Sequence, residues 1–157
     1  MFTVIRDRDY IAFAMASDPS YVHALIRYFE ELAPDWGIGD SGRMAVVLRE
    51  LLSNAITHGN RQDRSRNVSC RIERTPEGPF RITVEDEGTG FDFGCVNTTM
   101  PVDPRNVRRR GYILIRSICR SLHFNRRGNR VTVLVDQTEN CGQMRQTAVE
   151  GGGALRR

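Results

Sequence analysis

The stretch Arg49-Glu50-Leu51-Leu52-Ser53-Asn54-Ala55-Ile56-Thr57-His58-Gly59 has the pattern of the central helix of a folded domain. At about 100° per residue, its apolar residues and those just before it gather on one face of a helix. These residues are Met44, Val47, Leu48, Leu51, Leu52 and Ala55. Asp40 or Ser41 can cap the start of this helix, and Gly59 stands where a helix ends in a left-handed turn.

A polar stripe borders the apolar face of this helix. Glu50, Asn54 and His58 follow one another at intervals of four residues and therefore share one side, whereas Arg49 and Ser53 point away. An acid and a carboxamide at the edge of a core are costly to bury without partners, which indicates a partly closed functional site. An amphipathic helix whose border is simply polar is the equally open alternative.

Length and composition indicate one folded domain. The chain has 157 residues, of which 39% are hydrophobic and 27% charged, enough for a substantial core. Its longest apolar run, Tyr10 to Ala16, is too short to cross a bilayer. Charged residues interrupt the N-terminus, which argues against a secretory signal. We therefore expect a cytoplasmic protein that has no membrane partner.

Cysteine and basic residues exclude several classes of site. The four cysteines (Cys70, Cys95, Cys119 and Cys141) form no C-x-x-C pair, which argues against zinc and against a disulfide framework. All 23 basic residues are arginine, so a Walker A loop and a lysine-nucleophile enzyme are excluded. The net charge of +4 is spread along the chain without a nucleic-acid-binding signature, so we expect no direct nucleic-acid partner.

Periodicity predicts the elements of the first half of the chain. Tyr10–Ala16 reads as a strand, and residues 1–9 as an extension or an extra edge strand. Asp18-Pro19 starts a helix that ends near Pro34. Alternation in residues 68–72 and 80–84, with a Pro- and Gly-rich turn between them, predicts an antiparallel hairpin. Parity then places Asp86 on the inward face, where a carboxylate needs a hydrogen-bond partner.

The second half of the chain contains a long irregular segment. Residues 92–110 hold two prolines and little periodicity, and their length favours a functional lid over a passive loop. We expect Gly111 to open a helix that carries Leu114, Ile115, Ile118 and Leu122, followed by a second hairpin of residues 122–125 and 131–135. The predicted domain spans residues 10–136, and residues 137–157 read as a disordered tail.

Three motifs stand in order along the chain. They are E-x-x-x-N-A-x-x-H-G (Glu50 to Gly59), D-x-G-x-G-F-D (Asp86 to Asp92) and R-G-Y-x-L-I-R-S followed by F-N-x-x-G-N-x-V-T-V (Arg110 to Val133). In this combination the chain resembles the GHKL (Bergerat-fold) ATPases, and within them it is most similar to the small anti-sigma-factor serine kinases of bacteria. The resemblance covers Tyr10 to Val135. It implies an α+β two-layer sandwich, the histidine-kinase-like ATPase fold, with a mixed, mainly antiparallel sheet and helices on one face.

The resemblance also implies a site for ATP and Mg²⁺ between the helices and the lid. Glu50 corresponds to the catalytic base, Asn54 to the magnesium ligand and Asp86 to the aspartate that binds adenine. Magnesium prefers oxygen ligands and keeps several waters, so one amide oxygen together with phosphate oxygens is chemically sensible. His58 belongs to the first motif, so the resemblance counts it among the ATP-binding residues, and we interpret its own role as that of a helix-end residue.

Further residues of the motifs would surround the nucleotide. Gly88 and Gly90 would let backbone approach it, Gly111 at a helix start would offer amide N–H groups to phosphate, and Thr132 would help to hold adenine. One of the lid arginines, Arg105, Arg108, Arg109 or Arg110, could contact the γ-phosphate. The family has G-x-G at the end of the lid, whereas Arg109 replaces the first glycine here, which puts efficient phosphotransfer in question.

The function implied by the resemblance is that of an ATP-dependent protein serine kinase and anti-sigma factor. Its partners would be a sigma factor and a small antagonist (anti-anti-sigma, STAS-type) protein that it phosphorylates on serine, and the family leads us to expect a homodimer. Two alternatives stay open. One is a nucleotide-gated binding module with little or no transfer, and the other is a histidine-kinase-like ATPase domain that acts on another protein.

Overall fold

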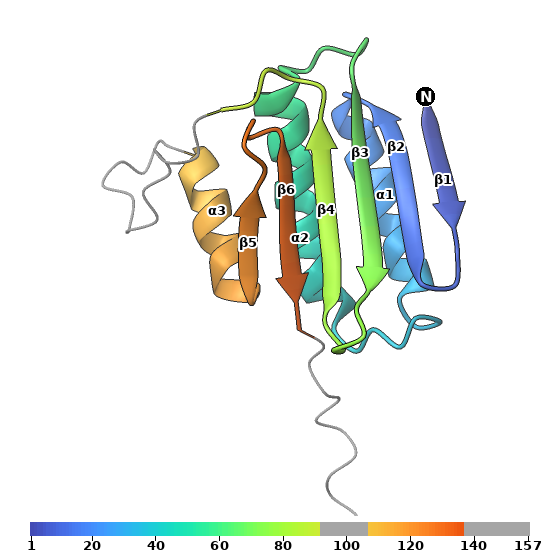
Figure 1. The fold of residues 1–157 in the computed structure, drawn as a ribbon. Helices are drawn as coiled ribbons and strands as arrows, with labels where there is room; N and C mark the ends of the chain where they lie inside the picture. The colour runs from blue at the N-terminus through green and yellow to red at the C-terminus, as the bar shows by residue number, and fades with distance from the viewer. Residues whose placement is uncertain (92–106, 137–157) are drawn as a thin grey trace, which may run out of the picture.

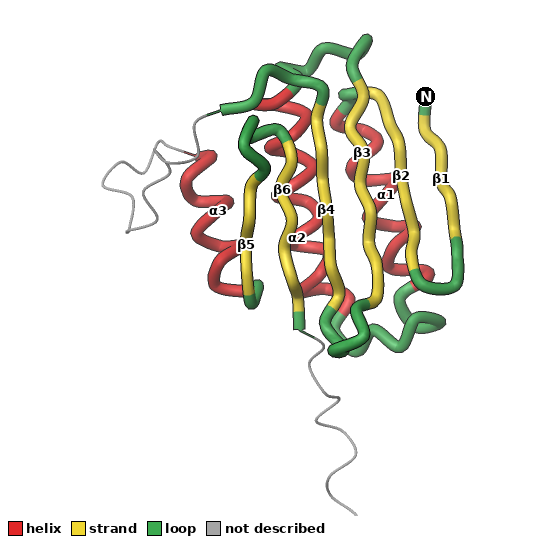
Figure 2. Tube along the Cα trace, viewed as in Figure 1, coloured by secondary structure: helices red, strands yellow, loops and turns green. Residues whose placement is uncertain are grey.

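The structure is a computed structural model that describes residues 1–91 and 107–136 (Figure 1). A six-stranded sheet in the order β1-β2-β3-β4-β6-β5 carries its helices on one face (Figures 1 and 2). The strands are β1 (Phe2–Arg6), β2 (Tyr10–Ala16), β3 (Asn67–Arg74), β4 (Phe80–Asp86), β5 (Ser121–Phe124) and β6 (Arg130–Val135). The helices are α1 (Pro19–Leu32), α2 (Ser41–Asn54) with its π-helical continuation η1 (Ala55–Gly59), and α3 (Val107–Ile118).

This architecture confirms the predicted α+β two-layer sandwich. Every strand pair among the described residues is antiparallel, so the parallel component implied by "mixed" is absent from them.

Alternation in the strands builds the sheet side of the core. In β4, Phe80, Ile82, Val84 and Asp86 are buried while the residues between them are half-buried or exposed. In β6 the buried residues are Val131, Val133 and Val135. One face of the sheet thus packs on the helices and the other faces outward, and the parity that places Asp86 inward is confirmed.

The first two helices begin where their capping residues predict. The carboxylate of Asp18 accepts a hydrogen bond from the Ser20 N–H at 3.0 Å, and that of Asp40 accepts one from the Arg43 N–H at 3.0 Å. The apolar residues predicted for the face of α2 are all buried. Arg49 and Ser53 are exposed, as the periodicity predicts.

The end of α2 differs from its prediction. The helix continues through Ala55–Gly59 as a π-helix, and the left-handed residues are Arg61 (φ 56°) and Gln62 (φ 59°) rather than Gly59. The extra residue in this turn breaks the spacing of four that would keep His58 in line with Asn54. Gly59 is therefore not a left-handed helix cap, and contacts at the site account for it instead.

The start of α3 also differs from its prediction. The helix begins at Val107, so Gly111 lies inside it rather than at its N-terminus. Leu122 belongs to β5, and Leu114 is 39% exposed, because the apolar stripe of α3 is carried by Tyr112 and Ile115. Glycine is a poor helix former but not a forbidden one, so interpreting it as a boundary was wrong here.

The ends of the predicted domain have different outcomes. Residues 2–6 form the edge strand β1, paired with β2. The lid predicted in residues 92–110 lies mostly outside the described residues, and the tail predicted for residues 137–157 lies wholly outside them. Within the described part of the chain, no helix is both long enough and apolar enough to span a membrane.

Candidate functional site

Asp86 lies at the end of β4, on the face of the sheet that the helices cover. Its side chain is buried, with 8% of the residue exposed, and its Oδ1 accepts a hydrogen bond from the Gly88 N–H at 2.9 Å. A carboxylate is tolerated in such a place only with hydrogen-bond donors around it. Asp86 is therefore a buried, hydrogen-bonded acid at the edge of an apolar core.

Two glycines bring backbone against this carboxylate. A Cβ on Gly59 would overlap the carboxyl group of Asp86, and a Cβ on Gly88 would overlap the carbonyl oxygen of Gly59. The end of η1, the loop after β4 and the Asp86 side chain thus meet at distances that leave no room for a methyl group. Close packing around Asp86 explains both glycines.

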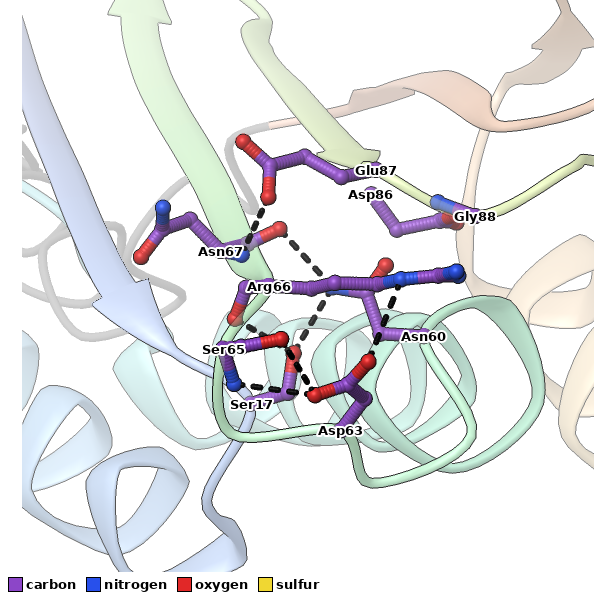
Figure 3. Close-up of polar contacts among 9 residues, drawn as sticks. All are labelled: Ser17, Asn60, Asp63, Ser65, Arg66, Asn67, Asp86, Glu87 and Gly88. Atoms are coloured by element: carbon purple, nitrogen blue, oxygen red, sulfur yellow. Dashed lines mark hydrogen bonds and ion pairs between the residues drawn. The ribbon is translucent and has the colours of Figure 1, made fainter.

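A polar network anchors the end of η1 beside Asp86. The Nδ2 atom of Asn60 donates to Ser17 Oγ at 2.7 Å and to the Asn67 carbonyl at 2.8 Å (Figure 3). Ser17 Oγ donates to the Arg66 carbonyl at 3.0 Å, and the Asn67 N–H donates to Glu87 Oε2 at 2.7 Å. These bonds connect the turn after η1 with β3 and the loop after β4, so they fix the backbone that surrounds Asp86.

The turn between β5 and β6 closes the other side. Gly90 (φ +79°) and Gly128 (φ +77°) have left-handed backbone, and a Cβ on either would overlap a backbone carbonyl of the opposite loop, that of Arg127 or of Phe91. The guanidinium of Arg127 donates to the Gly88 carbonyl at 2.9 Å. The second glycine of the D-x-G-x-G motif is thus required by contact with the β5–β6 turn.

A small hollow lies between α2, α3 and the sheet. Asn54 and Asp86 supply polar groups to it, and Leu51, Val84 and Val131 supply an apolar wall. Three aromatic rings also line it: Phe91, Tyr112 and Phe124 lie with centroids 5.3 to 6.3 Å apart. The β5–β6 turn contributes Gly128, Asn129 and Arg130. A hollow in which polar groups converge beside an apolar wall can orient a small molecule.

The polar stripe of α2 faces α3. A Cβ on Gly111 would lie 2.7 Å from Glu50 Oε2 and 3.5 Å from Asn54 Nδ2, so this glycine lets α3 approach both side chains. Asn54 is 9% exposed, and among the described residues its Nδ2 has no hydrogen-bond partner. An unsatisfied buried amide costs about 1–3 kcal/mol, which indicates a group kept for a ligand rather than for the fold.

The structure brings together some of the predicted site residues and separates others. Glu50, Asn54 and Gly111 meet between α2 and α3, and Asp86 and Gly88 meet at the end of β4. His58 is exposed at the end of η1 and does not line the hollow. The side chain of Arg110 lies outside the described part of the chain.

Two assignments are wrong in their geometry. Thr132 lies on the outward face of β6, where its hydroxyl is 3.2 Å from that of Thr83, so it does not reach the hollow on the helix-covered face. Gly111 is the fifth residue of α3, and only the first four N–H groups of a helix lack a partner within it. Its amide is therefore not an N-terminal donor for phosphate, although the residue does lie beside Glu50 and Asn54.

Other site residues were not singled out from the sequence. Asn125, Asn129 and the three aromatic residues contribute contacts that depend on tertiary packing. All five lie within the three motifs, which gave them no role of their own, and the Gly128-Asn129 turn indicates a hairpin but no partner for Asn129.

The donor set fits a nucleotide-bound magnesium better than a metal held by protein alone. The described residues contain no group of three or more His, Cys, Asp or Glu side chains that could hold a metal ion. Magnesium is commonly bound by one or two protein oxygens together with substrate phosphates and waters. The amide oxygen of Asn54, with Glu50 one turn away, suits that kind of site, whereas the unpartnered Nδ2 atom can only donate, for example to a phosphate oxygen.

The comparisons with known proteins agree with this fold. The model of the histidine kinase-like ATPase domain matches residues 15–135, so the chain belongs to this GHKL-type family. Domains of this family bind ATP, typically with Mg²⁺. No protein of curated function matches the chain.

Among solved structures, the chain is similar to the histidine kinase domain of a blue-light activated histidine kinase from Erythrobacter litoralis EL346. The sequences are 20% identical and the TM-score is 0.50. The match covers 78% of this chain and 61% of that one, and at this identity it speaks for the fold alone.

Proposed function

We propose that the chain is an ATP-dependent protein serine kinase and anti-sigma factor. Its substrate would be a small STAS-type antagonist that competes with a sigma factor for the same protein. The observation that carries the proposal is the meeting of Glu50, the buried amide of Asn54 and Gly111 between α2 and α3, a short distance from the inward Asp86. A carboxylate, an amide and an inward acid on one side of a sheet supply the groups that phosphoryl transfer needs for positioning.

Each residue has a separate role in this proposal. Asp86 accepts a hydrogen bond from the amino group of adenine. Asn54 provides an amide oxygen to magnesium, and the ion neutralises phosphate charge when it is bound. Glu50 accepts the proton of the incoming serine hydroxyl as the new oxygen–phosphorus bond forms and the bond to ADP breaks.

The test is single-turnover transfer of labelled phosphate from ATP to an antagonist protein, with wild type and Glu50→Gln. General-base catalysis contributes about 10²–10⁴-fold, so the variant should lose that factor in transfer while its Mg-ATP affinity stays within about twofold. Acid treatment of the product identifies the acceptor, because phosphoserine survives acid and phosphohistidine does not. An acid-labile product would contradict the serine kinase and favour a histidine-kinase-like domain acting in trans.

A second candidate is a nucleotide-gated binding module without useful transfer. It is favoured by α3, whose helical residues include position 109, where the chain has arginine instead of the family's lid glycine. Wild type that transfers no phosphate, but whose affinity for a protein partner changes with ATP, would support this candidate. Arg109→Gly is then the variant in which transfer should appear.

The remaining expectations belong to the same proposal. The protein would act in the cytoplasm, as a homodimer, on protein partners and not on nucleic acid. Sedimentation with and without Mg-ATP tests the homodimer directly.

A further inference from the structure

Asp86 lies beyond the last regular pair of the β4–β6 ladder. That pair joins Glu85 with Arg130, and Asp86 follows it. On this side its backbone is held by Asn129 through two hydrogen bonds. The Asp86 N–H donates to the Asn129 carbonyl at 2.9 Å, and the Asn129 side-chain Nδ2 donates to the Asp86 carbonyl at 2.7 Å.

The Asn129 side chain is itself fixed by a second asparagine. Asn125 Nδ2 donates to Asn129 Oδ1 at 2.9 Å, which determines which end of the Asn129 amide faces Asp86. The Asn125 Oδ1 atom accepts from the N–H groups of Gly128, Asn129 and Arg130 at 2.8 to 3.1 Å. Asn129 is 7% exposed, so these bonds form inside the protein, where an unmade partner is costly.

The surroundings make the position of Asp86 sensitive to this pair. The carboxyl group packs against Gly59 without room for a methyl group. A small shift of the Asp86 backbone must therefore either press the carboxylate into η1 or turn it away from the hollow.

We propose that Asn129, oriented by Asn125, is a positioning residue that sets base selectivity by holding the Asp86 carboxylate toward the hollow. This inference rests on the proposed function, in which Asp86 receives the amino group of adenine. It adds a specificity-determining pair, of which Asn129 borders the hollow and Asn125 lies behind it, outside the lining. Base selectivity should then depend on a hydrogen bond between two stretches of the protein.

The experiment compares the affinities of ATP and inosine triphosphate for wild type and Asn129→Asp. The inosine base carries a carbonyl oxygen where adenine carries its amino group, so it gains nothing from a correctly placed acceptor. The Asn129→Asp side chain still has an oxygen that accepts from Asn125 Nδ2. Its other oxygen replaces the Nδ2 donor and faces the Asp86 carbonyl oxygen, so that hydrogen bond is lost. We expect ATP affinity to fall about ten- to a hundredfold, the effect of one charged hydrogen bond, while inosine triphosphate affinity stays within about twofold.

A second variant and a control keep the test decisive if Asn129→Asp does not fold. Asn125→Asp keeps the oxygen that accepts from three backbone N–H groups, but it has no N–H group to donate to Asn129 Oδ1. The Asn129 amide should therefore turn over and set its oxygen against the Asp86 carbonyl, which should reduce selectivity in the same way. Thr83→Val disturbs the same two strands on the outward face, where Thr83 meets Thr132, and should leave selectivity intact.

The outcomes separate the two proposals. Equal losses for both nucleotides, or unchanged selectivity in both variants, overturn the positioning role and leave the nucleotide site standing. Wild type that binds ATP and inosine triphosphate equally overturns the role of Asp86, and the inference with it.

Discussion

The two sides of the candidate site are built in opposite ways. At the end of β4, which we call the clamped side, hydrogen bonds and close contacts join Asp86 to Gly88 and Asn129. Between α2 and α3, which we call the open side, the buried Nδ2 atom of Asn54 lacks a hydrogen-bond partner among the described residues. One side is completed by the protein, whereas the other contains a polar group that the fold itself does not satisfy.

The difference indicates how the two sides contribute to a ligand. A rigid, pre-organised acceptor selects a base because it cannot adjust to the wrong one. An unsatisfied amide lowers stability in the free protein and gains a partner only in the complex, which is the usual trade of stability for function. Substitutions on the clamped side should therefore reduce both stability and binding, whereas on the open side the two should change in opposite directions.

The largest effect is expected from Gly88→Ala on the clamped side. Its Cβ would overlap the Gly59 carbonyl, which is backbone and cannot rotate away. We expect a loss of about 1–3 kcal/mol in unfolding free energy and of about 100-fold or more in ATP affinity, measured by denaturant unfolding and calorimetry. Gly42→Ala is the control, because the nearest atom to its Cβ is 3.7 Å away. Gly42 lies in α2, so this variant should raise the unfolding free energy by up to about 1 kcal/mol and leave ATP affinity unchanged.

Asp86→Asn tests the acceptor itself. Loss of one charged hydrogen bond should lower ATP affinity by about ten- to a hundredfold and bring it close to the affinity for GTP, whose base lacks the amino group at that position. Glu85→Gln, next along β4 but on the outward face and paired with Arg130, should keep the preference for ATP. Wild type that binds ATP and GTP equally would rule out the assignment of Asp86.

Asn54→Leu tests the open side. Removing an unsatisfied amide should raise the unfolding free energy by about 1–3 kcal/mol, while the gain in ATP affinity that magnesium provides falls by about tenfold. Asn60→Leu is a matched control, since Asn60 is also a buried asparagine with one unpartnered amide atom among the described residues, its Oδ1, but its Nδ2 makes two hydrogen bonds, so that variant should be less stable. If Asn54→Leu is also less stable than wild type, the contrast between the two sides is wrong.

Thr132→Val should have the smallest effect. Because Thr132 lies on the outward face, the substitution removes only its contact with Thr83, and ATP affinity should change by less than about twofold, a difference of about 0.4 kcal/mol. A tenfold loss measured by calorimetry would show that the threonine reaches the nucleotide after all.

Periodicity predicted the parts of this molecule that depend on one element at a time. The apolar face of α2 and the inward direction of Asp86 follow from rotation or alternation along the chain. The cap at Asp18 follows from residue type, which for α2 left Asp40 and Ser41 open. The same alternation in β6, with Val131, Val133 and Val135 inward, already places Thr132 outward. Its assignment to the site came from the resemblance and conflicted with the strand pattern.

The parts that could not be predicted depend on two elements meeting. The π-helical turn that moves His58 out of line depends on how the end of α2 fits against β4 and the loop after it. A glycine stands inside α3 at position 111 where a Cβ would press on Glu50, and no local pattern reveals that contact. The bond from Asn129 to Asp86 joins residues 43 positions apart, for which a single sequence carries no signal.

That same separation has a consequence for the order in which the chain folds. The hydrogen bonds between Asp86 and Asn129 can form only after β6 has paired with β4, and a contact so distant in sequence must first overcome the entropy of closing its loop. The clamped side is therefore absent from any folding intermediate that has not yet docked β6. A nucleotide that recognises this side binds only to protein in which β6 has paired with β4. By mass action, a higher nucleotide concentration therefore stabilises that strand pairing.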